Sequence, residues 1–230
     1  HTANGRLNWN PNHHNEITFG YEFEAEKFGN NGFTPSGTGN FSVAAKQLSN
    51  TFFAQDLVSL FNGNLQLAGG FRAQVFSLDK PTFSVNNAPY SGVTLSNPPT
   101  AYTFDGSASY FFEQSGTKIR VHVGNSYRVP SLYERFGTFY SSFSNAFTAL
   151  GSPDLMPEKT IAFDGGIDQN FLSNKAKLSA TYFYTKLTDI IGFGNVVSNI
   201  GSTTRPFGGY LNPKRGISRG EGLSGGVQTC

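Results

Sequence analysis

The feature that most constrains the fold is a recurring alternation of apolar and polar residues. In residues 16–26 every odd position from Ile17 to Phe23 is apolar, whereas Glu22 and Glu24 hold even positions. Because successive side chains of a β-strand point to opposite faces, this pattern predicts a strand with one apolar and one acidic face. The same period recurs in eight more segments, five clear and three less clean: residues 64–76, 102–113, 118–128, 159–169 and 177–189, then residues 3–9, 50–58 and 217–228. We therefore predict about nine strands.

The links between these segments alternate between short and long. The short links are residues 10–15, 59–63, 113–117 and 170–175, and the long ones are residues 27–48, 77–101, 129–158 and 192–216. An antiparallel up-and-down transmembrane β-barrel, with tight periplasmic turns and long extracellular loops, produces this alternation. A soluble β-sandwich, the alternative fold, has no reason to place every long loop at the same end. The pattern favours an all-β barrel fragment of about nine strands.

Composition narrows the function classes. No segment has the roughly 18 consecutive apolar residues of a transmembrane helix, which excludes an α-helical membrane protein. A net charge of +2, spread along the chain, supplies no basic stripe and excludes nucleic acid as a partner. The single cysteine, Cys230, is the last residue, so these residues provide neither a disulfide pair nor a cysteine metal site, and its role is left open.

Two stretches of the chain resemble a known family. The sequence GNSYRVPSLYERFG, followed after an aromatic segment by GSPDLMPEKTIAFDGGI, is similar to the barrel signature of TonB-dependent receptors. FFAQDL with LAGGFR, and later YFYTKLTDII, also resemble hairpins of that family in the same order. The motif positions are Arg128, Pro130, Leu155, Pro157 and Glu158. One departure is Gly220, Glu221, Gly222 where the family has Gly-Val-Glu, which puts the register of the last strand in doubt.

The resemblance implies a function in transport. Such a receptor sits in the bacterial outer membrane, captures a large scarce ligand such as an iron-siderophore, cobalamin or another metal chelate, and imports it with TonB energy. Barrels of this family have roughly 22 strands around a plug domain. Residues 1–230 are therefore expected to be one partial barrel domain, without the plug, which contacts TonB, and without the C-terminal strands. A passive porin or another non-transporting outer-membrane barrel is the runner-up, and a soluble β-sandwich binding module is the third alternative.

Catalytic and metal chemistry find little support in the sequence. His13 and His14 fall in a predicted turn, where solvated turn residues are the alternative to metal binding. His122 is the one histidine in a predicted strand, and no spacing pairs it with a nucleophile. We expect neither enzyme activity nor a cofactor or bound metal.

Two sets of side chains are candidates for ligand contact. The first is polar and predicted to face the lumen, where a solvated wall is the alternative reading: Glu22, Glu24, Arg72, Arg120, His122 and Asp164. The second lies in the long link after residue 128: Tyr133, Phe136, Phe139, Tyr140, Phe143 and Phe147. Aromatic rings among small polar residues build adaptable recognition surfaces, but such a loop can equally fold on itself over the barrel mouth.

Three geometric predictions follow. The odd residues of 17–23 should lie on the convex face of the sheet, with Glu22 and Glu24 on the concave face. The sheet should stay open, because nine strands are too few to close the expected circumference. Pro157 fits the first residues of a strand at the barrel rim, and Arg128 ends the preceding strand there. Arg128 and Glu158 should therefore approach within ion-pair reach and fix the base of the aromatic loop.

Overall fold

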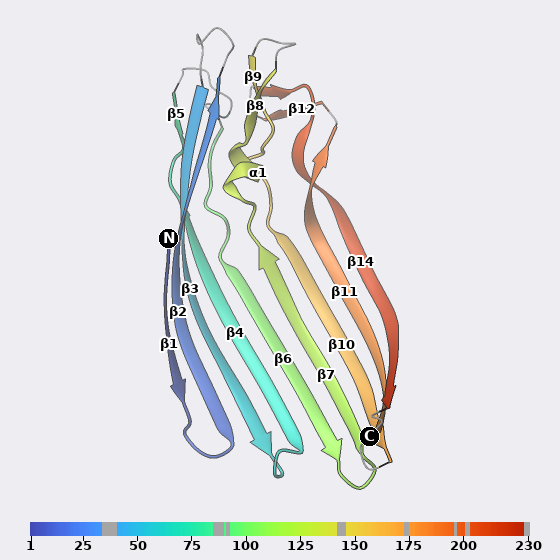
Figure 1. Ribbon diagram of the computed structural model, residues 1–230. Helices are drawn as coiled ribbons and strands as arrows, with labels where there is room; N and C mark the ends of the chain where they lie inside the picture. Colours follow the sequence, from blue (N-terminus) through green and yellow to red (C-terminus); the bar gives the residue numbers. More distant parts are fainter. Residues whose placement is uncertain are drawn as a thin grey trace.

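The main sheet of the computed structural model has nine antiparallel strands that follow one another in chain order (Figure 1). The structure describes residues 1–33, 41–84, 90, 93–141, 146–172, 175–195, 197–200 and 203–227. The nine strands are β1 (Thr2–Trp9), β2 (Asn15–Gly32), β3 (Phe41–Leu60), β4 (Leu65–Leu78), β6 (Ala101–Phe112), β7 (Thr117–Arg128), β10 (Glu158–Phe171), β11 (Ala176–Gly194) and β14 (Gly209–Val227). The predicted all-β, up-and-down arrangement of nine strands is confirmed.

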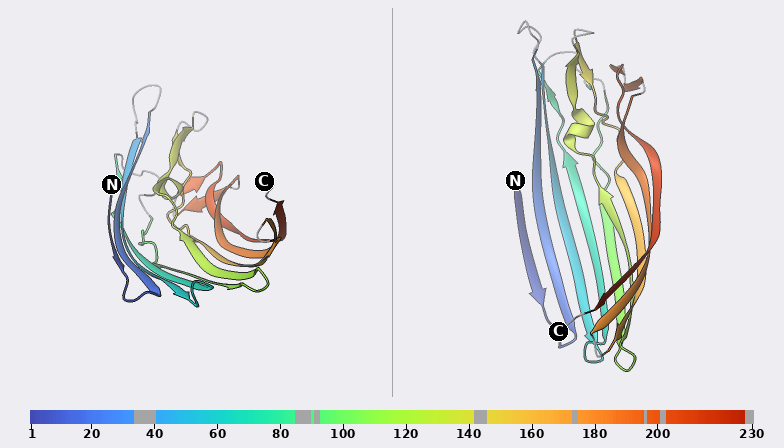
Figure 2. Two further views of the ribbon diagram at one scale, coloured as in Figure 1. Left: turned by 60° about the horizontal axis from the view of Figure 1, so that its bottom comes forward. Right: turned by 45° about the vertical axis from the view of Figure 1, so that its right-hand side comes forward.

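The sheet is curved into an open trough (Figure 2). Among the described residues β1 pairs with β2 alone and β14 with β11 alone, so the predicted open sheet is confirmed. The predicted facing is also confirmed. Glu24 and Glu26 line a recess together with the chain that leads into the helix α1 (Leu132–Phe136), which lies inside the trough. Their neighbours Phe19 and Tyr21 point to the opposite, convex side, where they are 44% and 39% exposed.

The two ends of the trough differ as expected, but the strands are longer than predicted. Short turns join β1 to β2, β3 to β4 and β6 to β7 at the lower end (Figure 1). The predicted links 27–48 and 192–216 are wrong as loops, because β2 runs to Gly32, β3 begins at Phe41, β11 runs to Gly194 and β14 begins at Gly209. Glycine and asparagine in these extensions weaken the strand pattern, while ladder pairing to the neighbouring strand still satisfies the backbone.

The two other long links also contain structure. Residues 129–157 form α1 and a hairpin of β8 (Thr138–Ser141) and β9 (Ala146–Ala149). A second hairpin, β12 (Ser198–Ile200) with β13 (Thr203–Arg205), follows β11, and the short strand β5 (Thr82–Phe83) pairs with β3. We call α1, the two hairpins, Tyr90 and residues 93–100 the cap. The buried cluster formed by Tyr90, Leu132, Phe136, Ala149, Ile200 and Ala45 joins the cap to β3.

Two close approaches on the concave face explain glycines that break the alternation. A Cβ atom added to Gly20 would lie 2.0 Å from Cζ of Phe53, and one added to Gly220 would lie 2.9 Å from Cε1 of Phe183. Each ring thus covers a glycine on the adjacent strand. In the motif that departs from the family, Gly220 pairs with Phe183, and the β11–β14 ladder shifts register between Leu187 and Gly192. No helix in the described part of the chain has the length and apolarity needed to cross a membrane.

Candidate functional site

The site begins at the rim, where strand becomes cap. Arg128 and Glu158 are direct partners in the β7–β10 ladder, and Nε of Arg128 lies 2.6 Å from Oε2 of Glu158. The prediction that these residues meet at one end of their strands is confirmed. The other nitrogens of the Arg128 guanidinium donate to both carboxylate oxygens of Glu134 at 3.0 to 3.2 Å. Arg128 therefore ties two strands of the wall to α1.

Glu134 also fixes the start of α1. Its carboxylate accepts from the backbone nitrogen of Ser131 at 2.8 Å, while the Ser131 hydroxyl accepts from the backbone nitrogen of Glu134. This reciprocal pair is a capping box, which satisfies two donors that the first turn of a helix would leave free. The sequence Ser-Leu-Tyr-Glu carries the signature of this box, a local signal for a helix that was not predicted here.

Glu158 makes a third connection, to β11. Its Oε1 atom accepts from the backbone nitrogen of Ile191 at 2.8 Å, just past the register shift at which Asp189 adopts a positive φ of 56°. Crossing the hydrocarbon core takes roughly 9–11 tilted residues. Glu158 is the last residue counted upward from the lower end of the 14-residue strand β10, so in a barrel that crosses a membrane it would lie above the core, at the mouth. There the hydrogen bond from Arg128 holds the pKa of Glu158 below its usual range.

The motif residues on either side of the rim are packed rather than exposed. Pro130 and Pro157 are among the fully buried side chains, and Leu155 is 8% exposed. The predicted position of Pro157 is confirmed, because β10 begins at Glu158. Asn212 on β14 holds the intervening Met156 by accepting from its nitrogen at 2.7 Å and donating to its carbonyl at 2.9 Å. The sequence analysis missed Asn212.

The aromatic segment divides into buried and exposed parts. Phe136 is fully buried in the cap core and thus presents no ring to the mouth, a correction to its placement in a recognition surface. Tyr133 is 43% exposed, and Phe139 packs against Phe207 at 5.6 Å. The predicted residues Tyr140 and Phe147 are backbone partners in the β8–β9 hairpin, and Phe143 lies outside the described residues.

Tyr133 lies in a row of rings that crosses the mouth of the trough. Its ring meets Phe28 of β2 edge-on at 6.0 Å and Tyr210 of β14 at 6.0 Å, and Tyr210 in turn meets Phe193 of β11 at 5.5 Å. The row thereby joins one end of the sheet to the other through α1. Phe28, Phe193, Phe207 and Tyr210 were not predicted, because the contacts join strands distant in the sequence.

Buried polar side chains hold the cap together from within. The hydroxyl of Tyr90 donates to the carbonyl of Gly137 at 2.5 Å and accepts from the backbone nitrogen of Gly151 at 2.9 Å. Arg205, 5% exposed, donates to the carbonyls of Gly151 and Tyr210. Burial raises the pKa of the Tyr90 phenol and lowers the pKa of Arg205. Three separate links of the chain thus converge on one polar node.

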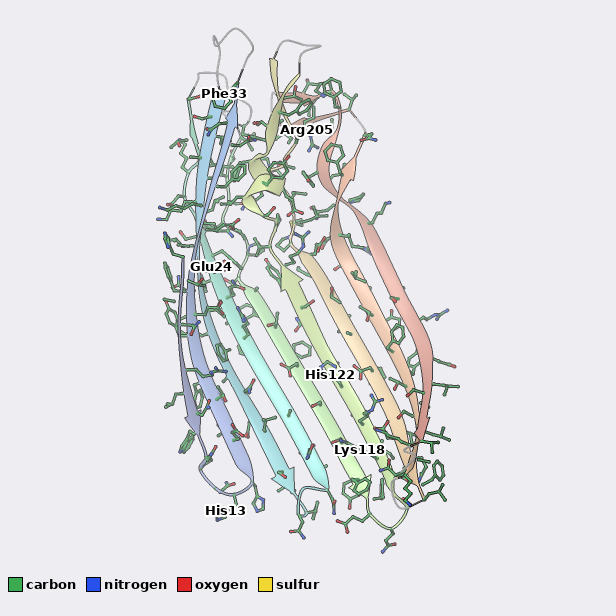
Figure 3. All side chains as sticks on the ribbon, viewed as in Figure 1. His13, Glu24, Phe33, Lys118, His122 and Arg205 are labelled. Carbon is green, nitrogen blue, oxygen red and sulfur yellow. The ribbon has the colours of Figure 1, made fainter. Side chains whose placement is uncertain are left out.

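Five of the six predicted polar residues of the concave wall lie in ion pairs, and Figure 3 labels one of them, His122. Arg72 lies 3.2 Å from Glu22, and Nδ1 of His122 lies 3.0 Å from Asp164. Arg120 and Lys177 each approach Asp168 to 3.5 Å. Glu24 faces the same side on β2. Within the part of the chain that the structure describes, no three histidine, cysteine or acidic residues are grouped to hold a metal ion.

A comparison with models of protein families identifies a family for this chain, and solved structures share its fold. A model of the TonB dependent receptor-like β-barrel matches residues 1–222. The siderophore receptor PirA from Acinetobacter baumannii is similar in structure, with a TM-score of 0.68, 16% identity, and 98% of this chain covering 34% of that one. The ferric enterobactin receptor PfeA from Pseudomonas aeruginosa, a Q482A mutant in complex with enterobactin, is also similar, with a TM-score of 0.66 and 16% identity. The alignment covers 96% of this chain and 32% of PfeA.

The copper transporter OprC also resembles the chain, with a TM-score of 0.63 and 16% identity. All of this chain aligns with 35% of OprC, so the chain spans about a third of the length of these structures. No curated protein sequence matches it significantly. The family model matches 222 of the 230 residues, including Arg128, Pro157 and Glu158 at the rim. The chain therefore belongs to the TonB-dependent receptor β-barrel family.

Proposed function

We propose that this chain forms part of the wall and mouth of an outer-membrane receptor that captures a large scarce ligand and imports it with TonB energy. The observation that carries this proposal is the rim network, in which Arg128 anchors α1 and its aromatic row above a polar concave wall. A wall alone would serve a passive pore. A cap fixed over the mouth by charged side chains suits capture.

The chemistry of the mouth indicates the kind of ligand. The exposed rings of Tyr133, Phe193 and Phe207, at 43%, 50% and 42%, offer broad apolar faces beside polar backbone. Rigid rings supply contact area at small entropic cost, which suits a bulky planar or aromatic ligand. The similar structures include proteins described as receptors for a siderophore, for enterobactin and for heme with its hemophore. A metal chelate such as an iron-siderophore or cobalamin therefore remains our proposal.

The domain arrangement is part of the proposal. Residues 1–230 make one partial barrel domain whose remaining strands and plug, through which TonB acts, are supplied by other parts of the full-length receptor. The plug would occupy the concave side, against the paired charges of the wall. The receptor would transport its ligand unchanged and would not act as an enzyme.

Uptake assays test the proposal. The full-length receptor is expressed in a Gram-negative host that lacks its own receptors for the probes, with and without a functional TonB. The probes are radiolabelled ferric enterobactin, heme, cobalamin and copper. We expect saturable uptake of one probe that disappears without TonB. Non-saturable entry of several small solutes that persists without TonB would identify a passive porin and overturn the proposal.

A further inference from the structure

A recess on the concave face, just below α1, has an unusual charge balance. It has a volume of about 390 Å³ and lies between β2, β3, β4 and the chain leading into α1. Glu24 and Glu26 line it from β2, Gln47 from β3 and Arg128 from the rim. We call it the acidic recess. Figure 3 marks Glu24 on β2 below the level of the cap.

The one cation that lines the acidic recess is already engaged. Arg128 directs its Nε to Glu158 and its two terminal nitrogens to Glu134, so it faces two carboxylates outside the recess. Glu24 and Glu26 form no ion pair with any residue that the structure describes. Two carboxylates two residues apart on one strand face repel each other, and a nearby positive charge would relieve this repulsion.

An independent observation comes from Gln47. It is the direct ladder partner of Glu26, so both side chains leave the sheet on the same face. Gln47 is 7% exposed, and its Oε1 atom is buried without a hydrogen-bond partner. Leaving a buried acceptor unpaired lowers the stability of the folded state, and native structures rarely do so without reason. A donor entering the recess would satisfy this oxygen.

We propose that the acidic recess receives a cationic group rich in N–H donors, an ammonium or a guanidinium. Such a group can place positive charge between Glu24 and Glu26 and donate to Oε1 of Gln47, whereas a neutral ligand would supply the donor without the charge. A metal ion is not favoured, because the described residues offer no group of three histidine, cysteine or acidic side chains that could hold one. Phe76, 6% exposed on the adjacent strand, supplies an apolar surface for the carbon chain that carries the charge.

Two sources could supply this chemistry. The group belongs either to a lysine or arginine elsewhere in the full-length receptor or to a cationic ligand that enters the mouth. The two sources differ in when the recess is filled. A side chain of the receptor fills it permanently and contributes to stability, whereas a ligand fills and stabilises it only when present.

Thermal unfolding of the purified full-length receptor in detergent separates these cases. Spermidine is the probe cation. The test variant is Glu24→Gln/Glu26→Gln, with Glu24→Gln alone as a milder version if the double variant folds poorly. Glu16→Gln is the matched control, because Glu16 lies on the same face of β2 but outside the acidic recess.

Each outcome decides the proposal. If spermidine raises the Tm of the wild type by several degrees but not that of the double variant, the recess takes a cationic ligand. If spermidine has no effect and the double variant melts several degrees lower, a side chain of the receptor fills the recess. If the double variant melts as the wild type or higher, and spermidine does not distinguish them, the proposal is wrong. Glu16→Gln should match the wild type throughout. Because stability is measured and not uptake, this test is independent of the proposed function.

Discussion

The strand wall and the cap bury their apolar side chains in different ways. Phe104, Val121 and Ile161 on the convex face of the wall are 45%, 43% and 47% exposed. In the cap, Leu132, Phe136 and Tyr90 are at most 1% exposed. In the receptor that we propose, lipid would cover the wall, whereas the cap covers itself like a small soluble domain. The stability of the cap should therefore depend on its own core and not on the bilayer.

The largest expected effect comes from emptying the cap core. Phe136→Ala removes a fully buried ring that meets Tyr90 edge-on at 5.8 Å. Such a truncation costs about 3 to 5 kcal/mol, which is enough to open a cap of this size. Hydrogen exchange of the full-length receptor should show lost protection in residues 132–157. The wall strands should keep theirs, and loss of protection throughout would show that wall and cap do not behave separately.

A pair of neighbouring substitutions in the wall should give opposite results. Val121→Arg places a charge on the lipid side of β7 near mid-strand, which costs about 2 to 4 kcal/mol at the membrane centre. His122→Arg places the same charge on the concave side. In the wild type Nδ1 of His122 lies 3.0 Å from Asp164, so the new guanidinium would have a carboxylate partner there. Urea unfolding in lipid bilayers should show a large decrease in the free energy of unfolding for Val121→Arg and little change for His122→Arg. Equal losses would mean that the two faces are not distinct environments.

A smaller effect is expected from Tyr90→Phe. The substitution keeps the ring in the core but removes the hydroxyl that joins Gly137 to Gly151. Both backbone groups keep the hydrogen bond from the Gly151 nitrogen to the Gly137 oxygen at 3.0 Å, so the cost is the net worth of the lost hydroxyl contact, about 0.5 to 1.5 kcal/mol. The cap should become more sensitive to proteases in residues 132–157. Phe139→Leu, which lies outside the node, is the control and should leave the cleavage pattern unchanged.

The sequence predicted the wall far better than the cap. Alternation is a local signal, and residues such as Phe19 and Glu22 reveal their faces without knowledge of any partner. The cap depends on contacts between distant segments. Tyr90 contacts Gly151, which is 61 residues later in the chain, and Phe28 contacts Tyr133, which is 105 residues later. No local sequence pattern marks such contacts. The cap residues in the candidate site were therefore only partly predictable.

The rim pair was predictable for a different reason. Proline at 157 fixed the start of β10 and Arg128 ended β7, so antiparallel pairing alone placed Glu158 opposite Arg128. The third partner, Glu134, was missed although its capping box has a signature in the sequence, because the five-residue helix α1 lies within a link that was expected to be a loop. Ile191 was missed because a register shift in β11, which no composition announces, presents its nitrogen to Glu158.

The last prediction tests whether the rim joins wall to cap for function more than for stability. Glu158→Ala removes one of the two carboxylates on Arg128 and leaves the Ile191 nitrogen without its acceptor. The side chains of Arg128 and Glu158 are 48% and 24% exposed, so water screens the pair and its loss should cost only about 0 to 1 kcal/mol of stability. Folding and membrane insertion should therefore be retained.

Ligand capture should suffer more, because Arg128 would lose its partner on β10, and α1, which Arg128 holds through Glu134, would be positioned less firmly together with the Tyr133 row. We expect binding of the transported probe to weaken about tenfold, or about 1.4 kcal/mol, in an equilibrium assay on whole cells. Glu113→Ala, at a turn on the opposite end of the barrel, is the control. Acid should have the same effect as the substitution. Because the pKa of Glu158 is lowered in the folded receptor, the contribution of its carboxylate to stability is fully present above the usual pKa of 4.5. That contribution is lost as the pH falls through the lowered pKa, at which the carboxylate is protonated. Unchanged capture by Glu158→Ala, with the variant fully inserted, would show that the rim pair is dispensable and that the cap holds its position through its own core.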